Sequence, residues 1–479
     1  MFFNSFDYAI FLPVVFIIYW LVFSKNLKIQ NLFVLSVSYL FYSFWDWRFL
    51  FLLAFSTLLD YFSGIQIHNS NSDKKKKIWL IISVCVNLGF LGFFKYYNFF
   101  IESFADMLKL LGMTPHYSTL NIILPVGISF YTFHGLSYVF DVYNGKIKPT
   151  RNWIDYALFV SFFPLLVAGP IERATHLLPQ IEKPRKFNYQ QAVDGLKQIL
   201  WGLFKKIVIA DNCAIGVNLI FDNYEAYSGG TLLVGAILFS FQIYGDFSGY
   251  SDIALGSGKL LGINLLKNFN YPYFSRDIAE FWRRWHISLS SWFKDYLYIP
   301  LGGSRGGTWM RIRNTFIIFL VSGFWHGANW TFLVWGGLNA LFIMPSIILK
   351  TNRNNLDIVA QGKKLPDIKE FAQITITFLL ASFAWIFFRS ETLHQAYYYI
   401  KKMFTTMQTP DFDLFNLSIF PLLAFFVFIE WLGRENNYAI EKVLHRSKIV
   451  FRWGFYYGLI VLLFIFAQKN AQEFIYFQF

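Results

Sequence analysis

The chain has 479 residues, of which 56% are hydrophobic and 22% aromatic, while only 15% are charged. With a mean hydropathy of +0.41, a soluble protein of this length would need an implausibly large core. The formal net charge of +13 gathers in short segments between apolar runs. This distribution argues against a nucleic-acid-binding surface and is typical of the cytoplasmic loops of a membrane protein.

Apolar runs near the ~20 residues needed to cross a bilayer recur along the chain. Examples are residues 8–23, 48–65, 78–94, 231–245 and 455–467. We therefore predict an all-α, polytopic integral membrane protein with roughly eleven transmembrane helices, together with re-entrant and interfacial helices. The first run lacks a preceding basic segment and a small-residue cleavage site, so we expect it to be a span and not a removed signal peptide.

Loop charge predicts the topology. The basic segments at 25–28, 72–77 and 145–151 lie between successive spans, and placing them in the cytoplasm puts the N-terminus outside. The segment VSFFPLLVAGP (160–170) must then enter the membrane and return, because IEKPRK (181–186) is basic again. Further basic segments at 267–313, Lys363–Lys364 and Arg446–Lys448 are also expected inside, which leaves the C-terminus outside.

The chain is predicted to form one membrane domain. It comprises N-terminal spans (1–118), a segment that carries the chemical motifs (119–345) and C-terminal spans (346–479). The tract TNRNNLD (351–357) is interpreted as a polar loop. The only two cysteines, Cys85 and Cys213, argue against a disulfide framework, and with no Cys/His cluster present we expect no metal site.

Residues 277–303 have a helical period. Apolar residues recur at spacings of three and four, and charged residues occupy the opposite side, which predicts one amphipathic helix at the cytoplasmic interface. His286 falls roughly 70° from the centre of the apolar stripe, at about 100° per residue. Taken alone, this position favours an interfacial histidine that only hydrogen-bonds its neighbours.

The stretch VSGFWHGANW (321–330) places His326 in otherwise apolar sequence. An ionisable residue at membrane depth is a functional candidate, and a neutral imidazole is what a general base requires. Asn329 lies about one helical turn further along and could line the same face. A packing role, with His326 bonded to a backbone carbonyl, remains open from local sequence.

Two further polar residues are candidates. His134 has nearby hydroxyl groups, Ser129, Thr132 and Ser137, which favour a structural role. Asp246 lies among glycines in IYGDFSGYSDIA (243–254). It is interpreted either as a buried substrate-binding carboxylate or as a residue at the end of a span.

Several long motifs in order resemble the bacterial branch of the membrane-bound O-acyltransferase family, and in particular its alginate O-acetylation members. They are LPVGISFYTF (124–133), FPLLVAGPIERATHLLPQI (163–181), FWRRWHISLSSWFKDYLYIPLGG (281–303), GFWHGANWTFLVWG (323–336) and FIYFQF (474–479). The resemblance implies helices around a thinned centre, where a tunnel joins the cytoplasm to the exterior. By this resemblance, the position of His134 more often holds Gln in the nearest relatives, which puts a binding role there in doubt.

The resemblance also implies the site. His326 corresponds to the family's catalytic histidine and His286 to its second histidine, at the cytoplasmic entry, so both are predicted as catalytic residues. The predicted substrate-binding residues around them are Trp325, Asn329, Asp246, Trp285 and Arg284. Trp325 or Asn329 is expected to stabilise the oxyanion, on sequence proximity alone.

The expected activity is transfer of an acyl group, taken as acetyl, to an extracytoplasmic polysaccharide, with His326 as general base. No bound cofactor is expected. The donor is taken to be acetyl-CoA, or alternatively an acylated carrier protein that docks on the basic 267–313 surface. By resemblance, a periplasmic esterase-like acetyltransferase is the partner and the bacterial cytoplasmic membrane the location.

Two other functions are left open by the sequence. The same fold could act on peptidoglycan, or on teichoic acid with D-alanine as the acyl group. A polysaccharide or lipid transporter without chemistry is the other alternative, although the chain lacks the paired interrupted helices of inverted-repeat transporters.

Overall fold

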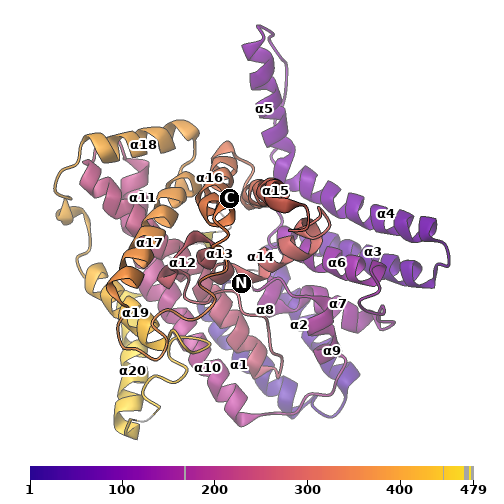
Figure 1. The fold of residues 1–479 in the computed structure, drawn as a ribbon. Coiled ribbons are helices and arrows are strands. Elements are labelled where there is room, and N and C mark those ends of the chain that lie inside the picture. Colours follow the sequence, from indigo (N-terminus) through magenta and orange to yellow (C-terminus); the bar gives the residue numbers. More distant parts are fainter. Residues whose placement is uncertain (167–168, 446, 469–473, 476–479) are drawn as a thin grey trace. The chain divides into compact units, whose positions relative to one another are not determined.

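The computed structural model describes residues 1–166, 169–445, 447–468 and 474–475. Within these ranges the regular elements are all helices, which confirms the predicted all-α architecture (Figure 1). The apolar composition explains this result. A backbone inside a bilayer must satisfy its own hydrogen bonds, and a helix does so within a single segment.

The chain folds as two compact units. They are unit 1, with Met1–Phe2, Asp7–Asn188 and Leu261–Leu265, and unit 2, with Phe3–Phe6, Tyr189–Leu260 and Leu266–Phe479. The main boundary falls inside the predicted motif-bearing segment, 119–345. That three-part division follows motifs and not compactness, so it stays a prediction.

Unit 1 is a bundle of helices. Counting α1 with the unit that holds most of it, they are α1 (Phe6–Leu21), α2 (Leu27–Asp46), α3 (Arg48–Asn69), α4 (Asp73–Leu91), α5 (Tyr97–Leu110), α6 (Ile128–Tyr143), α7 (Trp153–Ser161), α8 (Phe163–Leu166) and α9 (Ala174–Ile181). A π-helical turn, η1 (Gly92–Tyr96), joins α4 to α5. Figure 1 shows α3, α4 and α6 side by side, with α5 extending away from them.

The predicted re-entrant segment, 160–170, belongs to unit 1; it begins at the end of α7 and ends before α9. α7 has 9 residues, or about 14 Å at the helical rise, which is too short to cross a hydrocarbon core of about 30 Å. After Phe162 the chain forms the single-turn α8, and residues 169–173 have no regular structure before α9 begins. Residues 167 and 168 lie outside the described residues. The described neighbours are buried, so protein covers this non-helical backbone, as a membrane requires.

Unit 2 is built around the 32-residue helix α12. Its helices are α10 (Tyr189–Leu203), α11 (Asp211–Asp222), α12 (Gly229–Leu260), α13 (Ile278–Arg284), α14 (Ile287–Phe293), α15 (Gly307–His326), α16 (Trp330–Ile348), α17 (Ile368–Arg389), α18 (Leu393–Thr405), α19 (Ile419–Gly433) and α20 (Ile449–Phe466). The π-helical segments η2 (Phe204–Ala210) and η4 (Lys294–Tyr298) follow α10 and α14. α10 lies against α12 so closely that a Cβ on Gly202 would come within 2.6 Å of the Gly249 carbonyl oxygen.

Six described helices are long and apolar enough to cross a membrane, which supports an integral membrane protein. They span Arg48–Asn69, Asp73–Leu110, Gly229–Leu260, Trp330–Ile348, Ile368–Arg389 and Ile449–Phe466. Two shorter helices, α1 and α19, are also apolar. The expected number of roughly eleven spans and the sides of the two termini stay predictions.

The prediction of one amphipathic helix over 277–303 is wrong. The structure has two helices, α13 and α14, with a break at Trp285 and His286, and then η4. The apolar stripe is buried as expected, but Glu280 and Arg284 on the charged side are buried as well. An ion pair of 2.7 Å between them compensates for the loss of water.

Candidate functional site

His326 is the last residue of α15, and aromatic rings surround its side chain. The ring centroids of Trp325, of Trp335 on α16 and of Phe388 on α17 lie 4.9, 5.1 and 5.4 Å from that of His326. The residue is only 4% exposed, so these rings exclude most bulk water. Because the C-terminal end of a helix is the negative end of its dipole, this position favours a ring that accepts a proton.

The residues after His326 end α15 there and begin α16 at Trp330. Gly327 is extended, and Asn329 caps α16 by accepting a hydrogen bond from the Thr331 backbone N–H at 3.0 Å. Asn329 Nδ2 donates to the Glu391 carbonyl oxygen at 2.7 Å. Both ends of this amide are therefore engaged in structural bonds, and its predicted role at an oxyanion stays a prediction that these contacts do not support.

His286 occupies the break between α13 and α14 with backbone angles φ 44° and ψ 54°. This left-handed conformation is uncommon for a residue other than glycine and marks local strain. Two bonds from the preceding loop hold it in place. The Asn270 N–H donates to the Arg284 carbonyl, and the Ile287 N–H donates to the Asn268 carbonyl, both at 2.9 Å.

The structure brings the two predicted catalytic histidines together. Their ring centroids lie 6.2 Å apart, and the Trp325 ring is 6.0 Å from His286. His286 is 1% exposed, and neither of its ring nitrogens has a hydrogen-bond partner among the described residues. Burial lowers the pKa of His286 to about 3, so its imidazole is neutral near pH 7.

Two of the predicted substrate-binding residues lie in the surrounding core. Trp285 is buried, with its ring stacked on Phe281 at 5.5 Å and tilted against Trp385 at 5.0 Å. Arg284 pairs with Glu280 and donates to the Asp357 carbonyl oxygen at 2.9 Å. Both side chains are thus engaged in contacts within the protein, and a direct contact of either one with substrate stays a prediction.

Asp246, the remaining predicted binding residue, lies in a buried ion pair on α12. Its Oδ1 is 2.7 Å from Lys206 Nζ, and its Oδ2 accepts the Ile475 backbone N–H at 2.7 Å. Phe474 packs on the Tyr250 ring at 4.5 Å. The carboxylate therefore binds the described part of the FIYFQF motif, Phe474 and Ile475, to α12. Residues 476–479 of that motif lie outside the described residues.

An amphipathic groove that sequence reasoning missed lies beside α13–α16. It consists of two adjoining cavities of about 430 and 400 Å³, which share Thr315, Ile343, Asn352 and Arg353. Its apolar part is lined by residues that include Trp282, Leu289, Phe293, Ile318, Phe319 and Ser322, and its basic part by Arg311, Lys350 and Arg353. We refer to this feature as the amphipathic groove.

Two residues that line the amphipathic groove, Ser322 and Trp282, connect it to the surroundings of His326. Ser322 precedes His326 by one helical turn, and the Trp282 ring lies 5.7 Å from Trp335, which contacts His326. The loop 351–357 is therefore more than a polar connection, since Arg353 lines the groove and Arg283 donates to the Asn352 carbonyl at 2.7 Å. In the sequence, the signal for this groove was the pair of basic residues at the loop, Lys350 and Arg353.

His134 belongs to unit 1. It is buried on α6, and its Nε2 accepts the Glu172 backbone N–H at 3.0 Å. Ser137, one of the nearby hydroxyls, donates to the His134 backbone carbonyl oxygen and not to the ring. Among the described residues, no three His, Cys, Asp or Glu side chains gather as a metal-binding group.

Comparisons with known proteins place these residues in a family context. A model of the membrane-bound O-acyltransferase family matches residues 147–390, which include both histidines. The chain is 39% identical to the probable alginate O-acetylase AlgI of Pseudomonas aeruginosa, over 85% of this chain and 76% of that protein. The AlgI of Pseudomonas putida is 35% identical over 98% of both chains.

Relatives with other named acceptors also match. The peptidoglycan O-acetyltransferase of Helicobacter pylori is 38% identical, over 82% of this chain and 77% of that protein. The teichoic acid D-alanyltransferase of Bacillus subtilis is 29% identical, over 58% of this chain and 72% of that protein. All of these relatives are named as enzymes that transfer acyl groups, and none of them as a transporter.

Proposed function

Because the chain belongs to the membrane-bound O-acyltransferase family, we propose that this acyltransferase moves an acetyl group from a cytoplasmic thioester to a hydroxyl acceptor, for O-acetylation of an extracytoplasmic polysaccharide. The observation that carries the proposal is the buried pair of His286 and His326, whose rings lie 6.2 Å apart inside an aromatic cage. Such a dry site strengthens the electrostatic interactions that stabilise a transition state.

His326 acts as the general base. It removes the proton of the accepting hydroxyl while that oxygen forms a bond to the thioester carbonyl carbon. The C–S bond then breaks, and the proton passes from His326 to the departing thiolate, so that an ester and a thiol are released. His286 stays neutral and positions the reacting groups, and the adjacent Trp325 indole supplies a hydrogen-bond donor for the oxyanion.

The amphipathic groove receives the thioester donor. Its apolar part suits the thin, largely uncharged arm that carries the acyl group, and Arg311, Lys350 and Arg353 suit the phosphates at the other end of the donor. Acetyl-CoA has both features. An acylated carrier protein would use the same groove for its phosphopantetheine arm and the basic 267–313 surface for docking.

The acceptor is assigned from the relatives. The alginate O-acetylases match the most of this chain, and the peptidoglycan O-acetyltransferase has nearly the same identity. An acetyl group on a polysaccharide is therefore favoured, with peptidoglycan as the second candidate. Teichoic acid D-alanylation has less support, because that relative is less similar and matches a smaller part of the chain.

The hydroxyl at His326 belongs to a carrier and not to the polymer. A periplasmic esterase-like acetyltransferase then modifies the polysaccharide outside the cell. This arrangement places the chain in the bacterial cytoplasmic membrane with both termini outside. The basic loops support it, since their charge favours a cytoplasmic position for 72–77 and 267–313.

The decisive experiment measures ester-linked acetate on the purified surface polysaccharide. Cells that carry the native chain are compared with cells that carry His326→Ala, at equal membrane levels. The control is His68→Ala, which changes an exposed histidine at the end of α3. Peptidoglycan acetate and teichoic acid D-alanine are measured in the same cells.

Loss of polysaccharide acetate in His326→Ala alone, with unchanged polymer yield, is the expected result. Loss of peptidoglycan acetate instead would reassign the acceptor. Unchanged esters on all three polymers would remove His326 from the chemistry.

A further inference from the structure

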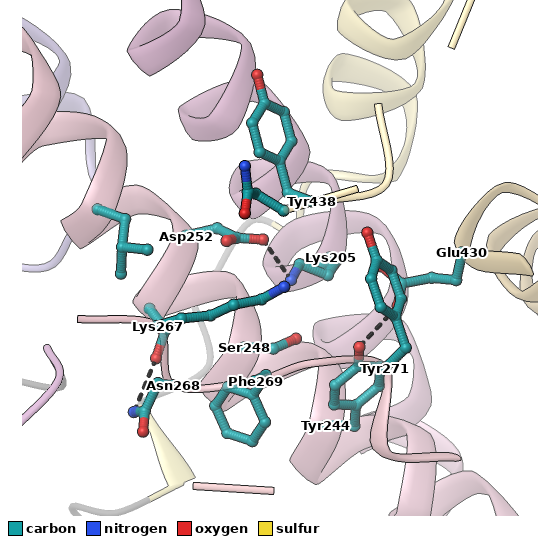
Figure 2. Close-up of a pocket in the computed structure, with 13 residues that line it drawn as sticks. Lys205, Tyr244, Ser248, Asp252, Lys267, Asn268, Phe269, Tyr271, Glu430 and Tyr438 are labelled. Atoms are coloured by element: carbon teal, nitrogen blue, oxygen red, sulfur yellow. Dashed lines mark hydrogen bonds and ion pairs between the residues drawn. The ribbon is translucent and has the colours of Figure 1, made fainter. Parts of the chain in front are cut away.

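A small cavity in unit 2 lies apart from the two histidines. It has a volume of about 20 Å³ and is lined by side chains of η2, α12, α19 and the loop that precedes α13 (Figure 2). Phe269 forms one wall, and its ring packs against Trp285 at 5.1 Å. A polar cavity of this size holds a group comparable to one or two water molecules.

The carboxylates around this cavity already have hydrogen-bond donors. Asp252 Oδ1 accepts from Gln198 Nε2 at 2.7 Å, and its Oδ2 pairs with Lys205 Nζ at 2.6 Å. Glu430 accepts from Trp201 Nε1 at 3.0 Å and from the Tyr244 hydroxyl at 2.7 Å. Each of the four carboxylate oxygens therefore already accepts a bond from a donor of the protein. The cavity offers a cation no carboxylate oxygen without such a donor.

Two hydroxyl groups at the cavity, unlike the carboxylates, have no hydrogen-bond partner among the described residues. They belong to Ser248 and Tyr271, which are 1% and 4% exposed. A buried hydroxyl without a partner costs about 1–3 kcal/mol. Figure 2 shows both side chains at the cavity, together with Lys205 and Lys267.

Two ammonium groups complete the lining. An ammonium has three N–H donors. Lys205 directs one of them to Asp252, and Lys267 directs one to Asn270 Oδ1 at 2.8 Å. Lys267 has no carboxylate within ion-pair distance among the described residues, and burial lowers its pKa to about 8. The carboxylates of Asp252, Glu430 and Glu441 act on its charge from beyond that distance, and the effect of burial outweighs theirs.

We infer that this cavity binds one small anion, of the size of chloride or formate, between the two ammonium groups and the two hydroxyl groups. Such a ligand accepts hydrogen bonds and donates none, which matches a lining whose donors exceed its available acceptors. The cavity is too small for a phosphate or for any part of a donor molecule larger than its terminal oxygens. The inference is independent of the chemistry proposed for His326.

The anion would connect the loop before α13 to the helices behind it. Lys267 and Tyr271 come from that loop, whereas Ser248 belongs to α12 and Lys205 to η2. The same loop holds the His286 turn through Asn268 and Asn270. Occupancy would therefore stabilise the folded chain and the turn that carries the second histidine.

Thermal unfolding of the purified full-length chain in detergent tests the inference. Sodium gluconate, whose anion cannot enter the cavity, is replaced stepwise by sodium chloride or sodium formate at constant ionic strength and pH 7. We expect the unfolding midpoint to rise saturably by about 2–5 °C. Sodium phosphate at the same ionic strength should give no such rise.

Two single-hydroxyl deletions and one lysine variant locate the effect. Ser248→Ala, Tyr271→Phe and Lys267→Met should each abolish most of the rise, and Lys294→Met, which changes an exposed lysine, should retain it. If Lys267→Met does not fold, the two hydroxyl deletions decide. No rise in the native chain, a full rise in both hydroxyl deletions, or a rise with phosphate alone would overturn the inference.

Discussion

The rings of His286 and His326 lie 6.2 Å apart, centroid to centroid, although they come from different helices and from separate motifs. Their surroundings differ, and the difference supports a separate proposed role for each histidine. His326 is at the C-terminal end of α15, where the helix dipole supports a proton taken up during reaction. His286 is enclosed without a polar partner among the described residues and stays neutral, so it suits positioning better than proton transfer.

This division predicts unequal losses of activity. His326→Ala should lower the rate of acyl transfer by about 10²–10⁴-fold, the usual contribution of a general base. His286→Ala should lower it by about 10-fold, the effect of roughly 1.4 kcal/mol of lost positioning. Transfer of radiolabelled acetate in membrane vesicles, normalised to the amount of protein, measures both. Equal losses in the two variants would contradict the assignment.

The backbone at His286 predicts a second, separable effect. With φ at 44°, any residue with a Cβ is strained by about 1–2 kcal/mol, and glycine is not. His286→Gly and His286→Ala both remove the ring, so their difference reports the backbone alone. We expect the glycine variant to have the higher thermal unfolding midpoint. A lower midpoint for glycine would mean that the positive φ is not maintained in the variants.

Acid should destabilise the folded chain through His286. Burial lowers the pKa of His286 to about 3, while a histidine in an unfolded chain titrates near ~6.5. Between these values the unfolded chain binds a proton that the folded chain does not, so stability falls as the pH decreases through this window. The slope is at most about 1.4 kcal/mol per pH unit.

Thermal unfolding midpoints between pH 7 and pH 4 check this dependence. The native chain should lose more stability over this range than His286→Gln, whose side chain does not titrate. Parallel pH curves for the two proteins would show that other groups dominate the acid response.

The break that places His286 could not be predicted from residues 277–303 alone. The apolar period continues through the break, and Phe281, Trp285 and Leu289 are all buried, so the pattern is compatible with one helix. The helix ends because Asn268 and Asn270, from an earlier loop, bond the backbone on either side of His286. Tertiary hydrogen bonds of this kind leave no periodic signal.

The all-α membrane fold followed from composition. The family motifs identified His326 and His286 as candidates, but they did not predict that the two rings lie 6.2 Å apart. Asn329 illustrates an ambiguity, since a residue before an apolar helix is as suited to capping as to substrate binding, and the structure shows the cap. The amphipathic groove was missed because its basic residues, Lys350 and Arg353, become neighbours of Arg311 only through packing.

The buried Glu280 predicts a large structural effect. It pairs with Arg276 at 3.1 Å and with Arg284 at 2.7 Å. Glu280→Gln leaves both guanidinium groups in a dry environment with less compensation, which should cost about 3–5 kcal/mol of stability. The unfolding midpoint of the purified chain measures it. Glu102→Gln, which changes an exposed carboxylate on α5, is the control and should have a native midpoint.

The contact of α15 with α16 predicts the effect of one added methyl group. A Cβ on Gly336 would lie 2.3 Å from the Phe319 carbonyl oxygen, whereas a Cβ on Gly337 would meet only Leu320 Cδ2, at 3.9 Å. Gly336→Ala must therefore push the two helices apart, which should cost roughly 1–3 kcal/mol of stability. Because α15 carries His326, the rate of acyl transfer should also fall by at least about 10-fold.

Gly337→Ala is the matched control for this substitution, because it adds the same methyl group to the same helix in ordinary van der Waals contact. It should retain native activity and gain up to about 1 kcal/mol, since alanine favours the helix more than glycine does. Acetate transfer and unfolding midpoints are measured for both variants at equal protein levels. If Gly336→Ala behaves like Gly337→Ala, the close backbone approach does not hold His326 in place. If only Gly336→Ala loses activity, the spacing of α15 and α16 is part of what positions the base.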